Sequence, residues 1–193
     1  AEKWLLESGT GKSRGGRRPI LLAFNARAGY VLGIDAGATH VTAIVTDLDA
    51  QILAETECPF RVADGPQVGL EAMVRIGNQA LAAAGVRADQ LVGMALGLPG
   101  PLDMRQGTIV APPIMPGWDR APVRERLQAA WGVPVYLDND ANLGALGESQ
   151  YGAGQGVANL AYIKVSTGIG CGIIINGSIY HGQTGAAGEI GHV

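Results

Sequence analysis

Asp35, Gly37 and Thr39 form the first group of residues whose types and spacing could do chemistry. They follow the apolar run 30–34 and precede the alternating run 41–45, which predicts a strand, a tight turn and a second strand. Asp35 could hold a hydrated divalent cation, Gly37 would let the backbone approach a phosphate, and Thr39 offers hydrogen-bond donors. The loop is a candidate phosphate site. A plain hairpin turn is the alternative, since short glycine motifs often lack a ligand.

A second polar pair, Asn139 and Asp140, follows an apolar strand predicted at 133–137 and opens a helix. Open α/β sheets bind ligands at the carboxyl ends of their strands. Asp140 could accept the proton of a substrate hydroxyl and activate it towards a phosphoryl group, while Asn139 could hold the same substrate. Helix capping is the alternative, but Asp138 already provides a competent cap, so two further polar residues exceed what capping requires.

Thr167 and Gly168 lie in a glycine-rich turn between the apolar runs 160–165 and 171–175. This order repeats the strand, turn and strand around Asp35, so it predicts a second phosphate loop. Two such loops on paired α/β halves predict a cleft between domains, which is a usual place for a small-molecule site.

Glu189 and His192 lie three residues apart in the glycine-rich segment 188–192. If this segment is helical, the two side chains share a face, and both could hydrogen-bond a polyol. A structural or surface histidine is the alternative. His192 could also be a metal ligand, although no cysteine pair accompanies it.

The composition predicts a globular protein in a reducing compartment. Of 193 residues, 47% are hydrophobic and 16% charged, which suffices for one sizeable domain or two small ones. Glycine occurs 30 times, which predicts many tight turns. Cys58 and Cys171 lie far apart and indicate neither a disulfide framework nor a metal knuckle, so a cytoplasmic location is expected. No run reaches the roughly 18 apolar residues of a membrane span, and no signal-peptide pattern opens the chain.

The spacing of apolar and turn residues predicts the order βββαβαβα, which is typical of a mixed sheet with helices on its faces. Pro66 marks the start of the first helix and Gly85 its end. The segment 97–103 is expected to be a loop. The other predicted elements are strands at 31–35, 41–46, 52–56, 91–96 and 133–137, a helix at 123–131, and a helix beginning after 138.

The beginning of the chain has a different charge from the rest. The net charge is −3, but residues 1–30 carry six basic and two acidic residues (+4), which leaves −7 for the remainder. A basic, glycine-rich tip between the apolar arms 4–6 and 20–22 predicts a β-ribbon that could contact a DNA backbone or minor groove. A solvated linker is the alternative. The candidate backbone contacts are Lys12, Arg14, Arg17 and Arg18.

The order of these motifs over about residues 30–193 resembles the ROK family of sugar kinases and sugar-responsive repressors. The motifs are Asp35-x-Gly37-x-Thr39, Gly97-x-Pro99-Gly100-x-x-Asp103, Met115-Pro116-Gly117-Trp118, Asn139-Asp140-Ala141-Asn142, Thr167-Gly168-x-Gly170 and Gly188-Glu189-x-Gly191-His192. The resemblance implies an α/β fold of the actin-like, ribonuclease-H-like ATPase type, whose two lobes bind sugar between them.

The resemblance also implies roles for single residues. Asp140 would be the catalytic base of a kinase, and the nucleotide, as Mg-ATP, would contact Asp35, Gly37, Thr39, Thr167 and Gly168. A sugar or sugar phosphate would contact Gly100, Asn139, Asp140, Glu189 and His192. His192 would ligate zinc together with cysteines from beyond this chain. A homo-oligomer, either a dimer or a tetramer, and no membrane partner are expected.

Within this resemblance, residues 1–27 are similar to the wing of the winged-helix DNA reader of ROK regulators, which stand-alone kinases lack. The expected division is a wing remnant at 1–27, a first α/β lobe at 28–155 and the start of a second lobe at 156–193, with operator DNA bound through an N-terminal domain. Ala38 stands where kinases commonly have glycine, and Ile114 where relatives often have a polar residue. The main hypothesis is a sugar-sensing repressor of carbohydrate metabolism.

Two other hypotheses are open. One is an ATP-dependent, glucokinase-like hexose kinase, because Asp35 and Asp140 are both present. The other is a fold whose two sites are vestigial and which mainly mediates dimerisation.

Overall fold

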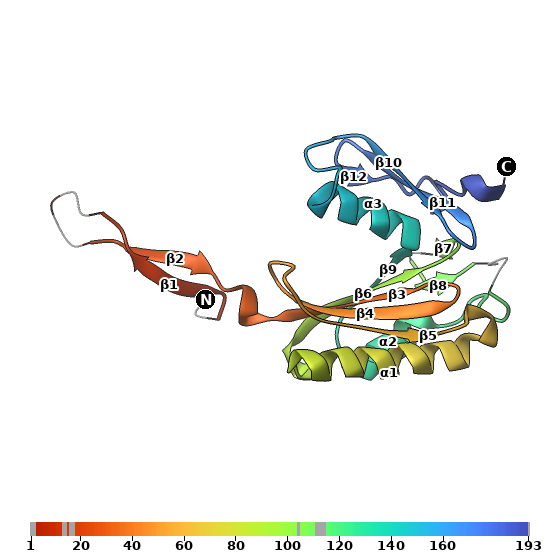
Figure 1. Ribbon diagram of the computed structural model, residues 1–193, viewed down its shortest axis with the longest axis horizontal. Coiled ribbons are helices and arrows are strands. Elements are labelled where there is room, and N and C mark those ends of the chain that lie inside the picture. The colour runs from red at the N-terminus through yellow and green to blue at the C-terminus, as the bar shows by residue number, and fades with distance from the viewer. Residues whose placement is uncertain (1–2, 13–14, 16–17, 104, 111–114, 193) are drawn as a thin grey trace.

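The computed structural model of the protein describes residues 3–12, 15, 18–103, 105–110 and 115–192. Figure 1 shows a two-stranded ribbon that projects from a larger body. In the body, helix α3 (Asp140–Tyr151) lies between a five-stranded sheet and a three-stranded sheet. Among the described residues, no helix is both long enough and apolar enough to cross a membrane.

The five-stranded sheet has the order β5-β4-β3-β6-β9. Strands β3 (Tyr30–Ala36), β4 (His40–Asp47) and β5 (Ile52–Pro59) form an antiparallel meander, which confirms the predicted three-strand unit. Strands β6 (Leu91–Leu98) and β9 (Val135–Asn139) run parallel to β3. The mixed sheet predicted from the element order is therefore confirmed, and its parallel strands end at one common edge.

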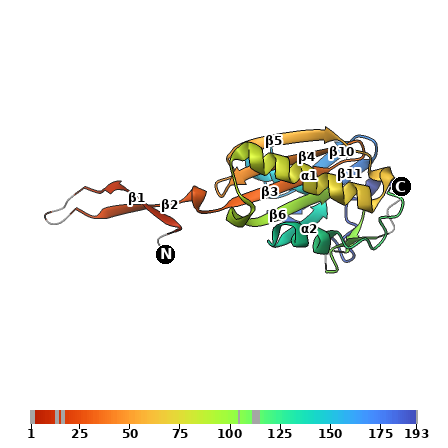
Figure 2. The same cartoon turned by 90° about the horizontal axis from the view of Figure 1, so that it is seen from below.

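Two helices cover one face of this sheet, α1 (Pro66–Ala84) and α2 (Val123–Trp131) (Figure 2). Helix α1 starts at Pro66 and ends before Gly85, whose φ of 65° is the left-handed cap geometry that glycine allows, as predicted. Its buried side includes Leu70, Met73 and Ile76, which pack into the main core with Leu32, Leu96 and other strand residues.

The Met115-Pro116-Gly117-Trp118 motif contributes its first and last residues to this core. Trp118 is fully buried, and its Nε1 donates to the carbonyl oxygen of Val62 at 2.8 Å. A Cβ at Gly69 of α1 would collide with the Trp118 ring, so glycine lets the indole lie against the helix. The tryptophan therefore fixes the start of α1.

The second sheet consists of β10 (Leu160–Val165), β11 (Ile169–Ile175) and β12 (Ser178–Ile179). It packs closely on α3, because a Cβ at Gly144 would collide with the Tyr162 ring and one at Gly172 with the carbonyl oxygen of Ala141. Helix α3 has apolar neighbours on two sides, since Leu143 lies against Gly97 of β6.

The segment 97–103 differs from the predicted loop. Strand β6 continues to Leu98, and β7 (Leu102–Asp103) pairs with β8 (Thr108–Ile109), so only Pro99, Gly100 and Pro101 connect two strands. Residues 97 and 98 stay in the sheet because both pair with β9, at Asp138 and Asn139.

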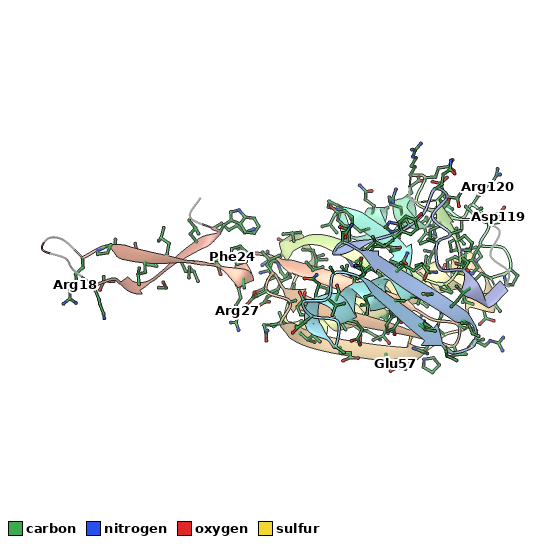
Figure 3. The ribbon with its side chains drawn as sticks, turned by 90° about the horizontal axis from the view of Figure 1, so that it is seen from above. Arg18, Phe24, Arg27, Glu57, Asp119 and Arg120 are labelled. Carbon is green, nitrogen blue, oxygen red and sulfur yellow. The ribbon has the colours of Figure 1, made fainter. Side chains whose placement is uncertain are left out.

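The projecting ribbon pairs β1 (Leu5–Thr10) with β2 (Ile20–Phe24), and both strands are exposed along their whole length. Figure 3 shows Arg18 near the tip and Phe24 and Arg27 at the base. The predicted ribbon arms are confirmed; Lys12 and Arg18 lie beside the tip, whereas Arg14 and Arg17 fall outside the described residues.

A short junction joins the ribbon to the body. The 3-10 helix η1 (Ala26–Ala28) is capped by Asn25, whose side chain accepts from the backbone N–H of Arg27. Leu48 N donates to the carbonyl oxygen of Ala26 at 3.0 Å, and Asn25 Nδ2 donates to that of Lys3 at 3.0 Å. The junction is thus hydrogen-bonded on both its ribbon side and its sheet side.

Candidate functional site

Three parallel strands place the acidic residues together at the carboxyl edge of the main sheet. Asp35 of β3 pairs with Gly97 of β6, and Gly97 pairs with Asp138 of β9. A Cβ at Gly97 would lie 3.1 Å from Asp35 Oδ1 and 3.7 Å from Asp140 Cα. The absence of a side chain at Gly97 therefore lets Asp35 approach the first residue of α3.

Asn139 is the N-cap of α3, which corrects the prediction that Asp138 takes this role. Asn139 Oδ1 accepts from the Ala141 N–H at 2.8 Å, and Asn139 Nδ2 donates to the Gly100 carbonyl oxygen at 3.3 Å. Gly100 has a φ of 93°, a conformation that favours glycine. Asn139 thus joins the helix start to the turn after β6.

Asp138 instead organises the residues around the cap. Its Oδ1 accepts from Asn139 N and from Asn142 Nδ2, each at 2.8 Å, and its Oδ2 lies 2.9 Å from His181 Nε2. Asn142 is buried, and its Oδ1 has no hydrogen-bond partner within the part of the chain that the structure describes. The network connects β9, α3 and the loop after β12.

Asp140 forms an ion pair with a lysine that sequence reasoning missed. Lys164 Nζ of β10 donates to Asp140 Oδ2 at 2.7 Å, and the two side chains are 30% and 12% exposed. In β10 the positions 160, 162 and 164 are the less exposed ones, so Lys164 occupies an inward position next to Tyr162. This alternation was the available signal, but it required knowing that α3 lies against this strand.

The electrostatic environment of Asp35 is set by several charges. Asp35 is exposed at the end of β3, but the surrounding atoms withdraw its carboxyl group partly from water, and this partial burial raises its pKa above the ordinary value of 3.8. The Asp140 carboxylate raises it further, whereas Lys164 and His40 lower it. Burial makes the largest contribution to the pKa of Asp35. It raises this pKa because it disfavours the charged carboxylate. The site therefore contains two close acidic groups with one lysine against them.

Glu189 is positioned by glycines that pack on β11. A Cβ at Gly188 would collide with the Cys171 carbonyl oxygen, and one at Gly191 would crowd that of Ile169. Cys171 N donates to the Gly188 carbonyl oxygen at 3.0 Å. The 3-10 helix η4 spans only Ile190–His192, so Glu189 precedes it and the shared helical face considered for Glu189 and His192 does not form.

A cavity of about 300 Å³ collects most of the predicted residues. Six of them line it: Gly100, Asn139, Asp140, Thr167, Gly168 and Glu189. Ala38 and Lys164 line it as well. Asp35, Gly37 and Thr39 are not among its lining residues, so the structure brings four of the predicted sugar contacts together with Thr167 and Gly168 but leaves the first phosphate loop outside.

The two loop glycines have no steric reason to be glycine. Neither Gly37 nor Gly168 has a φ in the left-handed region, and a Cβ at Gly168 would meet no atom within 4 Å. Gly168 is exposed and lines the cavity, so its backbone is open to a ligand. This is the situation expected where a ligand needs close access to the backbone.

A larger and more open groove, of about 870 Å³, lies between α1 and α2. It is on the opposite side of the main sheet from α3 and contains none of the predicted site residues. Among the described residues, no group of three or more His, Cys, Asp or Glu side chains could hold a metal ion. The cavity beside Asp140 is therefore the candidate site.

Known proteins are similar to this chain over most or all of its length. The sequence model of the ROK family matches residues 31–193. A putative xylose repressor from Caldicellulosiruptor sp. (strain Rt8B.4) is 35% identical over 192 residues, which is 100% of this chain and 48% of the relative. The chain spans about half the length of the curated relatives it matches.

Solved structures show the same fold. A ROK family glucokinase from Streptomyces griseus, in complex with glucose and AMPPNP, has a TM-score of 0.72 at 31% identity and covers 86% of this chain and 50% of its own. A ROK family transcriptional regulator, a homologue of the Escherichia coli MLC protein, has a TM-score of 0.80 at 24% identity and covers 99% of this chain and 48% of its own. The match to the regulator includes nearly all of the ribbon.

Proposed function

Because the chain belongs to the ROK family, we propose that it is the sugar-sensing part of a transcriptional repressor of carbohydrate metabolism. The observation that carries this proposal is the combination of a polar cavity at the start of α3 with a basic ribbon that projects from the same body. The putative xylose repressor aligns over the whole chain, ribbon included, which supports a regulator.

The cavity suits a neutral polyol. Asn139, Asp140 and Glu189 offer amide and carboxylate groups, and Thr167 adds a hydroxyl. A volume of about 300 Å³ lies at the lower end of the range for small-ligand pockets. Gly100, whose carbonyl oxygen already accepts from Asn139, would bring the turn after β6 against the sugar. D-xylose is the first sugar to test, because the aligned relatives are named as xylose repressors.

The ribbon supplies the proposed contact with DNA. Residues 1–27 would form a wing whose basic tip contacts the phosphate backbone, residues 28–155 a first lobe, and residues 156–193 the start of a second lobe. Lys12 and Arg18, together with Arg14 and Arg17, would neutralise phosphates without reading bases. Sequence-specific operator binding would come from a DNA-reading element outside this chain, and His192 would ligate zinc only with ligands outside it.

Regulation requires that sugar binds two conformations of the protein with different affinity. The cavity is lined on one side by residues at the edge of the main sheet, such as Gly100 and Asn139, and on the other by the turn between β10 and β11, so a bound sugar would bias how the two sheets sit around α3. A change in that arrangement would reach the ribbon through β3 and its junction.

The test uses the intact protein and DNA fragments that it selects from a random pool. Fragment binding is measured while D-xylose, D-glucose and other monosaccharides are titrated. We expect one sugar class to change the apparent affinity by about 5- to 150-fold, the range of ordinary allosteric coupling. Unchanged DNA binding with every sugar would contradict the proposal.

An ATP-dependent sugar kinase is the second candidate, favoured by the presence of Asp35, Asp140, Thr167 and Gly168 and by the glucokinase with bound AMPPNP. In that case Asp140 would accept the proton of a sugar hydroxyl as it attacks the terminal phosphate. Sugar-dependent ADP release by the intact protein, lost in Asp140→Asn, would support this candidate. Absence of turnover with every monosaccharide tested would remove it.

A further inference from the structure

Lys164 stands out because the strand that carries it is otherwise uncharged. Its neighbours in β10 are Leu160, Ala161, Tyr162, Ile163 and Val165, and its ammonium points towards α3. Its side chain is 30% exposed and lines the cavity, so the charge is partly withdrawn from water. A lysine in such a place needs a counter-charge.

Asp140 provides that counter-charge directly. The distance of 2.7 Å between Lys164 Nζ and Asp140 Oδ2 is that of a charge-assisted hydrogen bond, and the Asp140 side chain is only 12% exposed. The residue proposed as catalytic base in the kinase alternative therefore already has a cation bound to one carboxylate oxygen.

The positive charge of Lys164 also acts on Asp35. Asp35 Oδ1 lies close to the Cβ position of Gly97, as does the backbone of Asp140, and the Lys164 charge lowers the pKa of Asp35 against the opposing effect of burial. The other charged groups that act on Asp35 are the Asp140 carboxylate and His40. Two neighbouring carboxylates are groups that otherwise attract a divalent cation, and here a lysine ammonium is bonded to one of them.

The same geometry does not fit Mg²⁺. This ion requires oxygen ligands in near-ideal octahedral order, at distances of about 2.0–2.1 Å. An ammonium bonded to Asp140 Oδ2 occupies one of the ligand positions and repels a doubly charged ion. The Lys164 contact on Asp140 Oδ2 therefore works against joint coordination of Mg²⁺ by the carboxylates of Asp35 and Asp140.

We infer that the Lys164 ammonium takes the place of a divalent cation beside Asp140 and Asp35, so that the cavity holds a neutral sugar without supporting phosphoryl transfer. The inference rests on the proposed receptor function and deepens it, because it names the residue that separates binding from reaction. Lys164 is accordingly a specificity-determining residue. It balances the charge of the Asp140 carboxylate and attracts that of Asp35, so the cavity can accept a ligand that brings hydroxyl groups and no metal ion.

The test measures binding of Mn²⁺, a spectroscopic substitute for Mg²⁺, by electron paramagnetic resonance on the intact protein. Lys164→Met removes the charge at similar length, Lys164→Gln is a second neutral variant, and Lys164→Arg keeps the charge. We expect both neutral variants to bind Mn²⁺ at least about tenfold more tightly than the unmodified protein. This factor is modest because Lys164 is partly exposed and solvent screens its charge. Lys164→Arg should resemble the unmodified protein.

Two further measurements make the result specific. Adding Asp35→Asn to Lys164→Met should abolish the gained Mn²⁺ site, and Mn²⁺ should raise the melting temperature of Lys164→Met but not that of the unmodified protein. Equal Mn²⁺ affinity in the unmodified protein and both neutral variants, whether tight or absent, would overturn the inference. Titration of D-xylose and D-glucose into the same samples separately tests the receptor function, because failure of sugar binding does not alter the Mn²⁺ comparison.

Discussion

His181 Nε2 donates to Asp138 Oδ2 at 2.9 Å, and this contact joins the loop after β12 to the strand end that precedes the candidate catalytic residue. The carboxylate can only accept, so the histidine nitrogen carries the proton of this hydrogen bond. The contact bridges 43 positions in the sequence and links the two sheets at the same end of α3 as the cavity.

Removing this hydrogen bond should affect both the stability of the fold and the binding of sugar, and we expect the effect on stability to be small. We expect His181→Ala to lower the free energy of unfolding by about 0.5–1.5 kcal/mol, the ordinary value of one hydrogen bond, and to weaken sugar binding. His181→Gln, whose amide can still donate, should restore part of the sugar affinity. Calorimetric sugar titration and chemical denaturation check both effects; equal sugar affinity in the alanine variant and the unmodified protein would rule out the positioning role.

Asp35 should make stability depend on pH. Because burial raises its pKa above 3.8, the folded protein holds this proton more tightly than the unfolded chain does. The stability that the proton confers is therefore complete below about pH 3.8 and is lost as the pH rises through the raised value.

Asp35→Asn should accordingly raise the free energy of unfolding at pH 7, and the gain should shrink as the pH is lowered towards about 4. Denaturation curves at several pH values measure it. Glu57→Gln, at an exposed position of β5 labelled in Figure 3, controls for the loss of one surface charge. A variant that is less stable than the unmodified protein at pH 7 would show that the Lys164 attraction exceeds the cost of burial.

Two glycines of the same helix provide a matched pair. Gly144 lies against the Tyr162 ring, whereas a Cβ at Gly147 would meet nothing within 4 Å. Gly144→Ala should destabilise the protein by about 1–3 kcal/mol through overpacking, and Gly147→Ala should stabilise it by up to about 1 kcal/mol through helix propensity. Hydrogen exchange of the β10 amides should increase only in the first variant. Equal effects of the two substitutions would contradict the close packing of β10 on α3.

The ribbon tip should act on DNA through charge alone. Replacing Lys12 and Arg18 by alanine should weaken binding to all DNA sequences alike and reduce the salt dependence by about one unit of slope for each phosphate that is no longer neutralised. Arg27→Ala, at the base of the ribbon, is the matched control and should leave the slope unchanged (Figure 3). A sequence-dependent loss of affinity would mean that the tip reads bases.

The elements with strong local signals were predicted well. Pro66 and Gly85 mark both ends of α1, and the apolar spacing gives α2 its bounds, because proline and left-handed glycine act within a single turn. The cap of α3 was assigned to the wrong residue, since Asp138 and Asn139 are equally competent by type. The contacts of Asp138 with Asn142, four residues away, and with the distant His181 leave the cap to Asn139.

The residues around the cavity were predicted in part. Glycine and polar motifs revealed six lining residues, because their types are unusual between apolar strands. Lys164 and His181 remained hidden, since a single lysine or histidine has an ordinary surface explanation in any sequence. Their roles depend on distances across 24 and 43 positions, which no local pattern encodes.

The junction at Asn25 and η1 is short, and hydrogen bonds hold it to both the ribbon and the β4–β5 turn. In the proposed receptor the ribbon would act as a lever arm whose pivot is hydrogen-bonded to the sheet that carries Asp35. With six residues in β1 and a rise of about 3.4 Å per residue, the arm is roughly 20 Å long, so a rotation of about 10° at the pivot displaces its end by roughly 3–4 Å. That distance is comparable to the length of a hydrogen bond, so in the proposed receptor a small rearrangement around the sugar would be enough to separate the basic tip from a phosphate.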